Sequence, residues 1–363
     1  MDDVLVDADS LRRFVAAVLE AVGTEEEDAA IAADVLVTAD LTGHESHGVA
    51  RLEEQYARPV QTGAIAARGT LVTVRETAAT LVLDAQNGLG QPATKRAMDR
   101  CIAKAREAGT CMATVRNSNH HGIAGYYPQL AAAHDMIGVC CTTAGALVVP
   151  TGGRTSLLGT NPLAFAAPAG RHQPFMLDMA TSVVPIGKVE VKVRRHTPLP
   201  EGWAVDAQGQ SATNAAEVLG RAFGDMTGGL LPLGGLEAGH KGYGLAAMVD
   251  ILAGVLAGAQ VSLHVREAMA SGEGAGIGHF VAAIDLAAFG AVDEFKAAMD
   301  AYIDDLHAAP CAPGTDRVRV AGEPEFEARE RHLRTGLPLH GGVAASLQEL
   351  GRELRVPLFR LLG

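Results

Sequence analysis

Histidines gather in four polar, glycine-containing stretches of this sequence. They are His44 with His47, His120 with His121, His240, and His279. An imidazole changes its charge close to neutral pH, so it can give or take a proton during a reaction. One such histidine would more often be structural, but four similar stretches predict that at least two of them line a single pocket.

The stretch RNSNHHGIAGYY at residues 116–127 follows a β-rich run at 112–115. A loop directly after a strand presents side chains and free backbone N–H groups. Gly122 would let a ligand approach the backbone closely. The alternative is an N-capped turn before a helix, and the two interpretations are compatible. We expect the chemistry to centre on His120.

The stretch GHESHGVAR at residues 43–51 combines Ser46 and His47 with Arg51. The planar fork of an arginine matches the two oxygens of a carboxylate, and a serine beside a histidine can pass a proton. Adjacent residues of a helix do not face one another, so a relay between Ser46 and His47 requires a loop. On spacing alone, a helix end with exposed polar residues explains this stretch better.

Two further stretches have the composition of nucleotide-binding loops. DMATS at 178–182 follows an apolar run, and its side chains could hold ribose hydroxyls or cap a helix. GHKGYG at 239–244 places His240 and Lys241 between glycines before a long apolar run. Helix N–H groups and a lysine at that point would suit a phosphate.

The stretch GLGQPA at 88–93 matches the G-x-G-x-x-A pattern of Rossmann dinucleotide sites. Pro92 and the long approach from Asp84 weaken the tight turn that such a site needs. Arg116 stands where an acidic residue would hold a ribose, although an arginine would suit a 2′-phosphate. The Rossmann interpretation therefore stays an alternative to a structural turn.

The hydrophobic pattern predicts helices at both ends of the chain and a mixed α/β segment between them. One helix is capped by Ser10, a second begins with a Thr24–Glu27 capping box and ends near Leu41, and another runs to about Gln61. Strands are predicted at 70–74, 79–84, 112–115, 137–142, 161–167 and 175–178, and further helices at 91–108, 286–308 and 325–334. The more polar residues 189–227 are predicted to form an excursion over the surface.

Composition excludes several classes of protein. The 363 residues are 48% hydrophobic, which favours two folded subdomains over disorder. A net charge of −12 without a basic stripe argues against a nucleic-acid partner. Five cysteines without a CxxC pair, and an acidic N-terminus without an apolar leader, favour the cytoplasm. The apolar run 242–261 carries Asp250 at its centre, so we expect a buried helix of a soluble core rather than a membrane span.

Six blocks in one order resemble the type-2 malate/L-lactate dehydrogenase family. They are GHESHGVAR, NSNHHGIAGYY, GTNPLAFAAP at 159–168, DMATS followed by GK, LPLGG followed by GHKGYGLA, and IGHF at 277–280. The resemblance implies a mixed α/β fold that is not a Rossmann fold. Residues 1–65 and 286–363 would form a helical subdomain, residues 66–285 an NAD(P)-binding subdomain with a mixed sheet, and two chains a homodimer.

By position, the resemblance implies that His120 is the catalytic acid and base and that Arg51 binds the substrate carboxylate. Ser46 and His47 correspond to a pair assigned to proton relay or substrate contact. The implied contacts of the cofactor, NAD or NADP, are His120, Gly122, Ile123, Ala124, Thr160, Asp178, Met179, Ala180, Lys241, His279 and Phe280. No metal ligand is implied.

Two positions depart from the family pattern near the expected substrate pocket. The family usually has Phe after the catalytic histidine, whereas this chain has His121, which we expect to contact the substrate. The family often has Leu-Pro-x-Tyr after the arginine, whereas here Tyr56 comes one residue later, behind Gln55.

Together these residues predict an oxidoreductase that moves a hydride between NAD(P) and a small 2-hydroxy or 2-oxo acid. Arg51 would hold the carboxylate and His120 would exchange the proton, while the cofactor carries the hydride. One alternative is an NADPH-dependent reductase of a cyclic imino acid. Others are a metal-dependent hydrolase built on the first four histidines and a non-catalytic binding protein.

Overall fold

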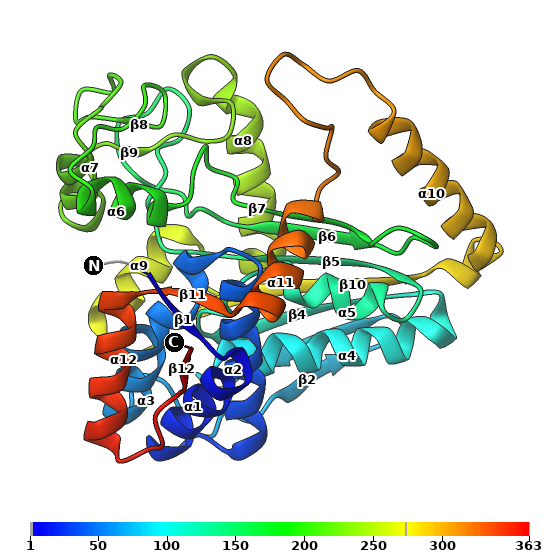
Figure 1. Ribbon diagram of the computed structural model, residues 1–363, viewed down its shortest axis with the longest axis horizontal. Helices are drawn as coiled ribbons and strands as arrows, with labels where there is room; N and C mark the ends of the chain where they lie inside the picture. Colours follow the sequence, from blue (N-terminus) through cyan, green and yellow to red (C-terminus); the bar gives the residue numbers. More distant parts are fainter. Residues whose placement is uncertain (1–2, 273, 363) are drawn as a thin grey trace.

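A mixed sheet of seven strands crosses the middle of the protein (Figure 1). The computed structural model describes residues 3–272 and 274–362. The strands lie in the order β2 (Val72–Glu76), β3 (Thr80–Asp84), β4 (Thr110–Ser118), β10 (Ile277–Asp285), β5 (Met136–Thr142), β6 (Leu163–Ala167) and β7 (Phe175–Met179). Within this sheet β3 and β4 are parallel, and the other neighbours are antiparallel. The prediction of a mixed α/β fold without Rossmann topology is therefore confirmed, because a Rossmann sheet is parallel.

The predicted strands all overlap observed ones, but β10 was not predicted as a strand, although the IGHF block lies within it. Seven consecutive residues of β10 are buried. This strand pairs with β4 on one side and with β5 on the other, and both faces of the sheet are covered. A strand covered on both faces has no polar alternation by which its sequence would reveal it.

Two helices cover one face of the sheet, α4 (Gly90–Ala108) and α5 (Tyr126–Ala132). The GLGQPA stretch is the turn from β3 into α4, and the crossover through α4 is what allows β3 and β4 to run parallel. Gly88 packs so closely on Gly69 that a Cβ there would lie 2.8 Å from the Gly69 Cα. The glycines thus serve the turn.

The two ends of the chain meet in one hydrophobic cluster. It joins α1 (Ala8–Ala21), α2 (Glu26–Leu41) and α3 (Arg58–Thr62) to α12 (Gly341–Leu354). Beside them β1 (Asp3–Val6) pairs with β11 (Leu337–His340) and β12 (Leu361–Leu362), three short strands that were not predicted. Residues 1–2 and 363 of the predicted helical subdomain lie outside the described residues.

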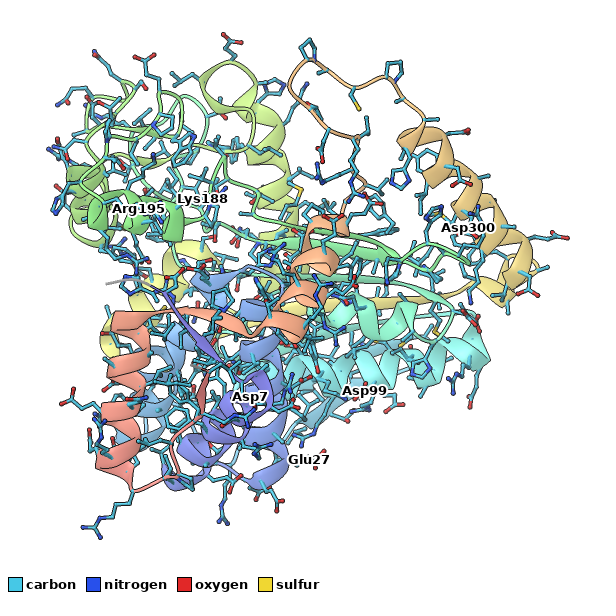
Figure 2. The ribbon with its side chains drawn as sticks, in the orientation of Figure 1. Asp7, Glu27, Asp99, Lys188, Arg195 and Asp300 are labelled. Carbon is cyan, nitrogen blue, oxygen red and sulfur yellow. The ribbon has the colours of Figure 1, made fainter. Side chains whose placement is uncertain are left out.

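Both predicted helix caps are wrong. The cap of α1 is Asp7, whose carboxylate accepts the Ser10 N–H at 2.8 Å (Figure 2). The second helix begins at Glu26 without a side-chain cap, and the Thr24 hydroxyl is buried with no partner in the described part of the chain. A carboxylate binds a helix N-terminus better than a hydroxyl because it also interacts with the helix dipole.

The predicted surface excursion contains a small lobe with its own core. Its elements are α6 (Ile186–Arg194), β8 (Ala204–Val205), α7 (Ala215–Phe223) and β9 (Gly229–Leu230). Val189, Val218 and Leu230 are buried together there. The lobe matters for function because α6 reaches the histidine loops described below.

The apolar run 242–261 is buried on one side only, which corrects the prediction of a fully buried helix. It belongs to α8 (Gly235–Val249) and to the π-helical continuation η4 (Asp250–Val255), followed by α9 (Ser262–Ser271). The Asp250 carboxylate accepts the Ser262 hydroxyl at 2.7 Å, whereas Ile251 and Val255 are exposed. No helix among residues 3–272 and 274–362 is both long and apolar enough to cross a membrane.

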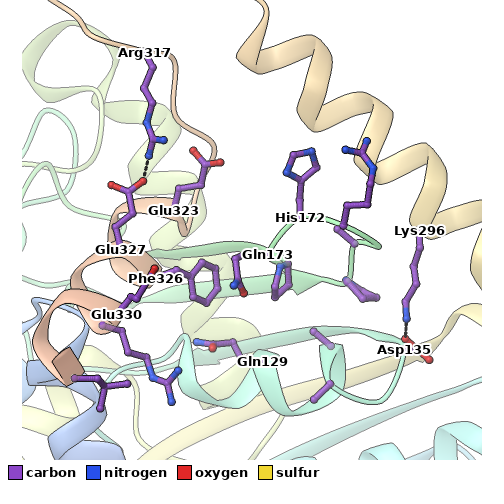
Figure 3. A pocket seen from close by; sticks show the side chains of 18 residues that line it. Gln129, Asp135, His172, Gln173, Lys296, Arg317, Glu323, Phe326, Glu327 and Glu330 are labelled. Atoms are coloured by element: carbon purple, nitrogen blue, oxygen red, sulfur yellow. Dashed lines mark ion pairs between the residues drawn. The ribbon is translucent and has the colours of Figure 1, made fainter. Parts of the chain in front are cut away.

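Helix α10 (Val292–His307) extends away from the sheet and is anchored through Asp300 (Figure 2). The Asp300 carboxylate accepts the N–H groups of Gly170, Arg171 and His172 in the turn between β6 and β7. A hollow of about 920 Å³ lies between α5, α10 and α11 (Glu323–Thr335) and is lined by charged and apolar side chains alike (Figure 3). None of the predicted site residues lines it.

Candidate active site

The structure brings the imidazoles of His47 and His120 together from two distant loops. Their rings stack with centroids 5.6 Å apart and planes inclined by 26°. His47 ends the 3₁₀ turn η1 (Glu45–His47), and His120 lies directly after β4. The C-terminal end of β4, an interior strand, thus positions His120, and the loop after α2 positions His47.

Tyr56 completes this group, although it was not among the predicted site residues. Its hydroxyl oxygen lies 2.5 Å from Nδ1 of His120. The segment that carries it, η3 (Leu52–Ala57), is a π-helix, which accommodates one residue more than an α-helix. Tyr56 thus reaches His120 from a π-helical turn.

Ser46, His47 and Arg51 form a connected network in the loop after α2. The Ser46 hydroxyl lies 2.8 Å from Nδ1 of His47, so the loop geometry required for a relay is present. Arg51 donates from Nε to the Ser46 carbonyl at 2.8 Å and from Nη2 to Glu190 at 2.9 Å. Glu190 belongs to α6, and Gly187 of the same helix packs on Ser46, where a Cβ would be only 2.6 Å away.

Asp40, near the end of α2, contacts the backbone of the same loop. Its carboxylate accepts the Val49 N–H at 2.7 Å, and a Cβ at Gly48 would lie 2.0 Å from one of its oxygens. Asp40 is buried, and no cation pairs with it in the described part of the chain. Burial raises the pKa of Asp40 to about 8, although the Val49 N–H opposes this shift.

Replacement of Asp40 by Asn should flatten the pH dependence of stability. The carboxyl titrates near 3.8 when free and near 8 in the folded protein, so the native state binds its proton more tightly. The stability it contributes is therefore fully present below about pH 4 and is lost as the pH rises to about 8. Calorimetry between those pH values should show a steeper fall of Tm for the wild type than for Asp40→Asn. The exposed Asp9→Asn serves as control, and equal slopes for all three proteins would contradict this assignment.

A second stacked pair lies behind the first. The rings of His121 and His279 are nearly parallel, with centroids 4.6 Å apart. The ring of Tyr127 also stacks on that of His121, with centroids 4.9 Å apart. His279 is fully buried, with its Nδ1 2.8 Å from the Thr142 hydroxyl and its Nε2 2.8 Å from the Ser118 hydroxyl. Both its ring nitrogens are thus occupied within the protein. Nε2 of His121, in contrast, is buried and has no partner among the described residues.

The histidines of the cluster are neutral near pH 7. Burial, reinforced by Arg51 and His44, lowers the pKa of His47 to about 4. Burial, followed by the effects of His47 and Arg51, holds the pKa of His120 well below its usual value. A neutral imidazole can accept a proton or donate one from its single N–H. The site is therefore suited to acid–base exchange with a bound ligand.

The residues expected to bind the cofactor lie in three other places. Asp178 accepts the Gly125 N–H at 2.7 Å and so links β7 to the loop after His120. Thr160 accepts the N–H of Thr181 at 2.9 Å, which joins the two loops at the ends of β6 and β7. Lys241 is exposed on α8 and forms no ion pair within residues 3–272 and 274–362. Ile123, Ala124, Met179, Ala180 and Phe280 are buried or half-buried.

One of the four predicted histidine stretches, that of His240, stays apart from the cluster, and so does His44, although its neighbour His47 belongs to it. His44 lies 3.2 Å from the Thr42 hydroxyl and 4.0 Å from Glu325, and His240 is exposed on α8. In the described part of the chain no three His, Cys, Asp or Glu side chains are arranged to hold a metal ion. The four cysteines Cys101, Cys111, Cys140 and Cys141 are buried free thiols.

Comparison with known proteins identifies the family. The family model of malate/L-lactate dehydrogenase matches residues 6–348. The malate dehydrogenase of Pyrococcus abyssi is 43% identical over 356 residues, which cover 97% of this chain and 96% of that protein. The L-sulfolactate dehydrogenase of Methanocaldococcus jannaschii is 35% identical over 97% of both proteins.

The fold agrees with this match. The crystal structure of malate dehydrogenase from Entamoeba histolytica superposes with a TM-score of 0.95 at 35% identity, over 98% of this chain and 99% of that one. The match thus extends over the sheet, the helical ends and the histidine loops together. The chain belongs to the malate/L-lactate dehydrogenase family of oxidoreductases.

Proposed function

We propose that this chain transfers a hydride between NAD(P) and a small 2-hydroxy or 2-oxo acid at the cluster of His47, Tyr56 and His120. The observation that supports this most is the convergence of two neutral imidazoles with Arg51, from loops far apart in the sequence. Arg51 would bind the substrate carboxylate through its fork. His120 would exchange the proton of the 2-hydroxyl, with Ser46 and His47 completing the proton path and His121 shaping the pocket.

The cofactor residues fit a dinucleotide in their chemistry. Lys241 offers an unpaired ammonium for a phosphate, and Asp178–Ala180 with Thr160 offer oxygen and N–H groups for a ribose. Gly122, Ile123 and Ala124 would form the wall beside the nicotinamide, supported from behind by His279 and Phe280. The bound nicotinamide would supply or take the hydride, and the protein's part is to orient the substrate and move the proton.

A substrate panel tests this function. Purified protein should change nicotinamide absorbance with at least one of pyruvate, oxaloacetate, sulfopyruvate or a related 2-oxo acid, with NADH and NADPH assayed in parallel. A cyclic imino acid is included because an imine would accept the same hydride and proton. Turnover of the imine alone would replace the 2-oxo acid as substrate, and no turnover with any compound would contradict the proposal.

We also propose that two chains form a homodimer through the exposed face of α8 and η4. Met248, Ile251, Val255 and Leu256 are exposed there at helical spacing, and monomers rarely leave such a stripe uncovered. A second copy of the chain is the expected partner because the stripe is uncharged and continuous. We further propose that residues 1–65 and 286–363 form a helical subdomain and residues 66–285 a cofactor subdomain. A cytoplasmic location is proposed as well, because it suits buried free thiols.

Light scattering should give a mass near twice 37.6 kDa for the wild type. The Val255→Glu variant should shift toward the monomer, because the interface would have to bury a carboxylate. Met269→Glu, at an equally exposed apolar position on α9, serves as control and should stay dimeric. A wild-type mass equal to that of one chain would contradict the proposed homodimer.

A further inference from the structure

Gln91 is a fully buried residue whose amide has no hydrogen-bond partner in the described part of the chain. It is the second residue of α4, within the GLGQPA stretch, and its exposed fraction is 0%. Neither its Oε1 nor its Nε2 has a partner among the described residues. Buried amides are almost always hydrogen-bonded, because leaving them unpaired destabilises the fold. An unpaired one beside a reactive group therefore calls for a functional reason.

The start of α4 lies directly against the loop that carries His120. A Cβ at Gly90 would lie 2.1 Å from the Asn119 carbonyl oxygen and 2.6 Å from that of His120. The Cγ of Gln91 would be 4.0 Å from a Cβ at Gly122. The amide also lies beside the Tyr56 hydroxyl: burial raises the pKa of that phenol, while Arg51 and the Gln91 amide lower it.

The hydrogen bonds around His120 assign its tautomer. Gly122 N–H donates to Nδ1 at 3.2 Å, and a backbone N–H can only donate. Nδ1 of the neutral ring therefore carries no proton, and Nε2 does. It follows that Tyr56, 2.5 Å from the same Nδ1, is also a donor. Nε2 has no hydrogen bond to any described residue, so its N–H is free to face a ligand.

We propose that Gln91 is a positioning residue for proton transfer: its amide stays unpaired while Tyr56 donates to Nδ1 of His120, and it stabilises the Tyr56 oxygen once that proton has left. This rests on the proposed function. As a 2-oxo group gains the hydride at carbon, its oxygen takes the proton from Nε2, and Nδ1 takes the proton of Tyr56. The amide N–H of Gln91 then donates to the phenolate oxygen until water restores the proton. Oxidation of the 2-hydroxy acid is the reverse sequence.

The Gln91→Met variant tests this, because methionine keeps the length and packing of the side chain but removes the amide. We expect kcat to fall about 10- to 100-fold, with KM unchanged within about two-fold, since only the proton step is affected. We expect Tm to stay equal or to rise, because an unpaired buried amide is removed. A residue that merely supports the fold would lower Tm together with kcat, and that result would overturn the proposal, as would an unchanged kcat.

A matched control and an independent readout complete the test. Thr114, on β4, also has a buried hydroxyl without a partner, and Thr114→Val should leave kcat unchanged. Nitrogen NMR of the ligand-free protein should show His120 with its proton on Nε2, and a proton on Nδ1 would overturn the tautomer assignment. The NMR result needs no turnover, so it separates failure of this inference from failure of the substrate panel.

Discussion

Replacement of His120 by alanine should lower kcat by about 100- to 10,000-fold, the usual contribution of a general acid–base residue. Of the cluster residues, His120 combines a ring nitrogen bonded to Tyr56 with a second nitrogen that has no hydrogen-bond partner among residues 3–272 and 274–362. Its loss leaves the hydride acceptor without a proton source. Binding of NADH or NADPH, measured by nicotinamide fluorescence, should change little, because the proposed phosphate and ribose contacts lie elsewhere.

The control for His120 is His134, an exposed histidine beyond α5 whose ring contacts Arg106. His134→Ala should keep the wild-type kcat. That result would show that the fall in kcat is specific to His120 and does not follow from the loss of any histidine. If His120→Ala instead turns over at the wild-type rate, another residue is the acid–base group. His47 would be the first to examine, because its ring stacks on that of His120 and it is neutral for the same physical reason.

The sequence predicts those parts of the fold whose pattern is local. Helix α4 and strands β3 and β5 were predicted within a few residues, since their apolar positions repeat at a clear period. Strand β10 was not, because burial on both faces removes the alternation. The predicted caps were wrong although Ser10 and Thr24 match the capping pattern. Asp7 caps α1 in place of Ser10, and α2 begins with acidic residues and no side-chain cap.

The site was predictable in its histidines and its arginine, which the ordered blocks carry. Tyr56 was visible only as a departure from the family pattern, and its place beside His120 depends on the π-helical turn that carries it. Glu190 and Gln91 could not be predicted. Glu190 lies in a stretch that looks like a polar surface, and the unpaired state of the Gln91 amide is a property of packing that no local pattern encodes. Asp40 resembles any acidic residue near a helix end until its burial is known.

Substitution of Arg51 should have the second large effect, this time on substrate binding. The fork of Arg51 binds the Ser46 carbonyl and Glu190. Arg51 and Glu190 are each about 30% exposed, so their ion pair is worth little, roughly 1 kcal/mol or less, and a substrate carboxylate can share or displace it. A bound carboxylate that is shielded from water interacts more strongly with the same guanidinium, because the local dielectric constant is lower. The contribution of Arg51 to substrate binding therefore increases as water is excluded.

Arg51→Lys should therefore raise KM for the acid by about 30-fold or more, equivalent to roughly 2 kcal/mol or more. Lysine keeps the charge but loses the planar fork, so the carboxylate is bound at one point and the reacting carbon is less well oriented. Arg51→Met should be worse, because Glu190 is then left without its partner. Arg58→Lys is the control: Arg58, the first residue of α3, donates to both oxygens of Glu353 away from the histidine cluster, and the KM of this variant should match the wild type. Wild-type kinetics for Arg51→Lys would show that the carboxylate binds elsewhere, and would leave the Arg51–Glu190 pair as a contact that only holds α6 against the loop.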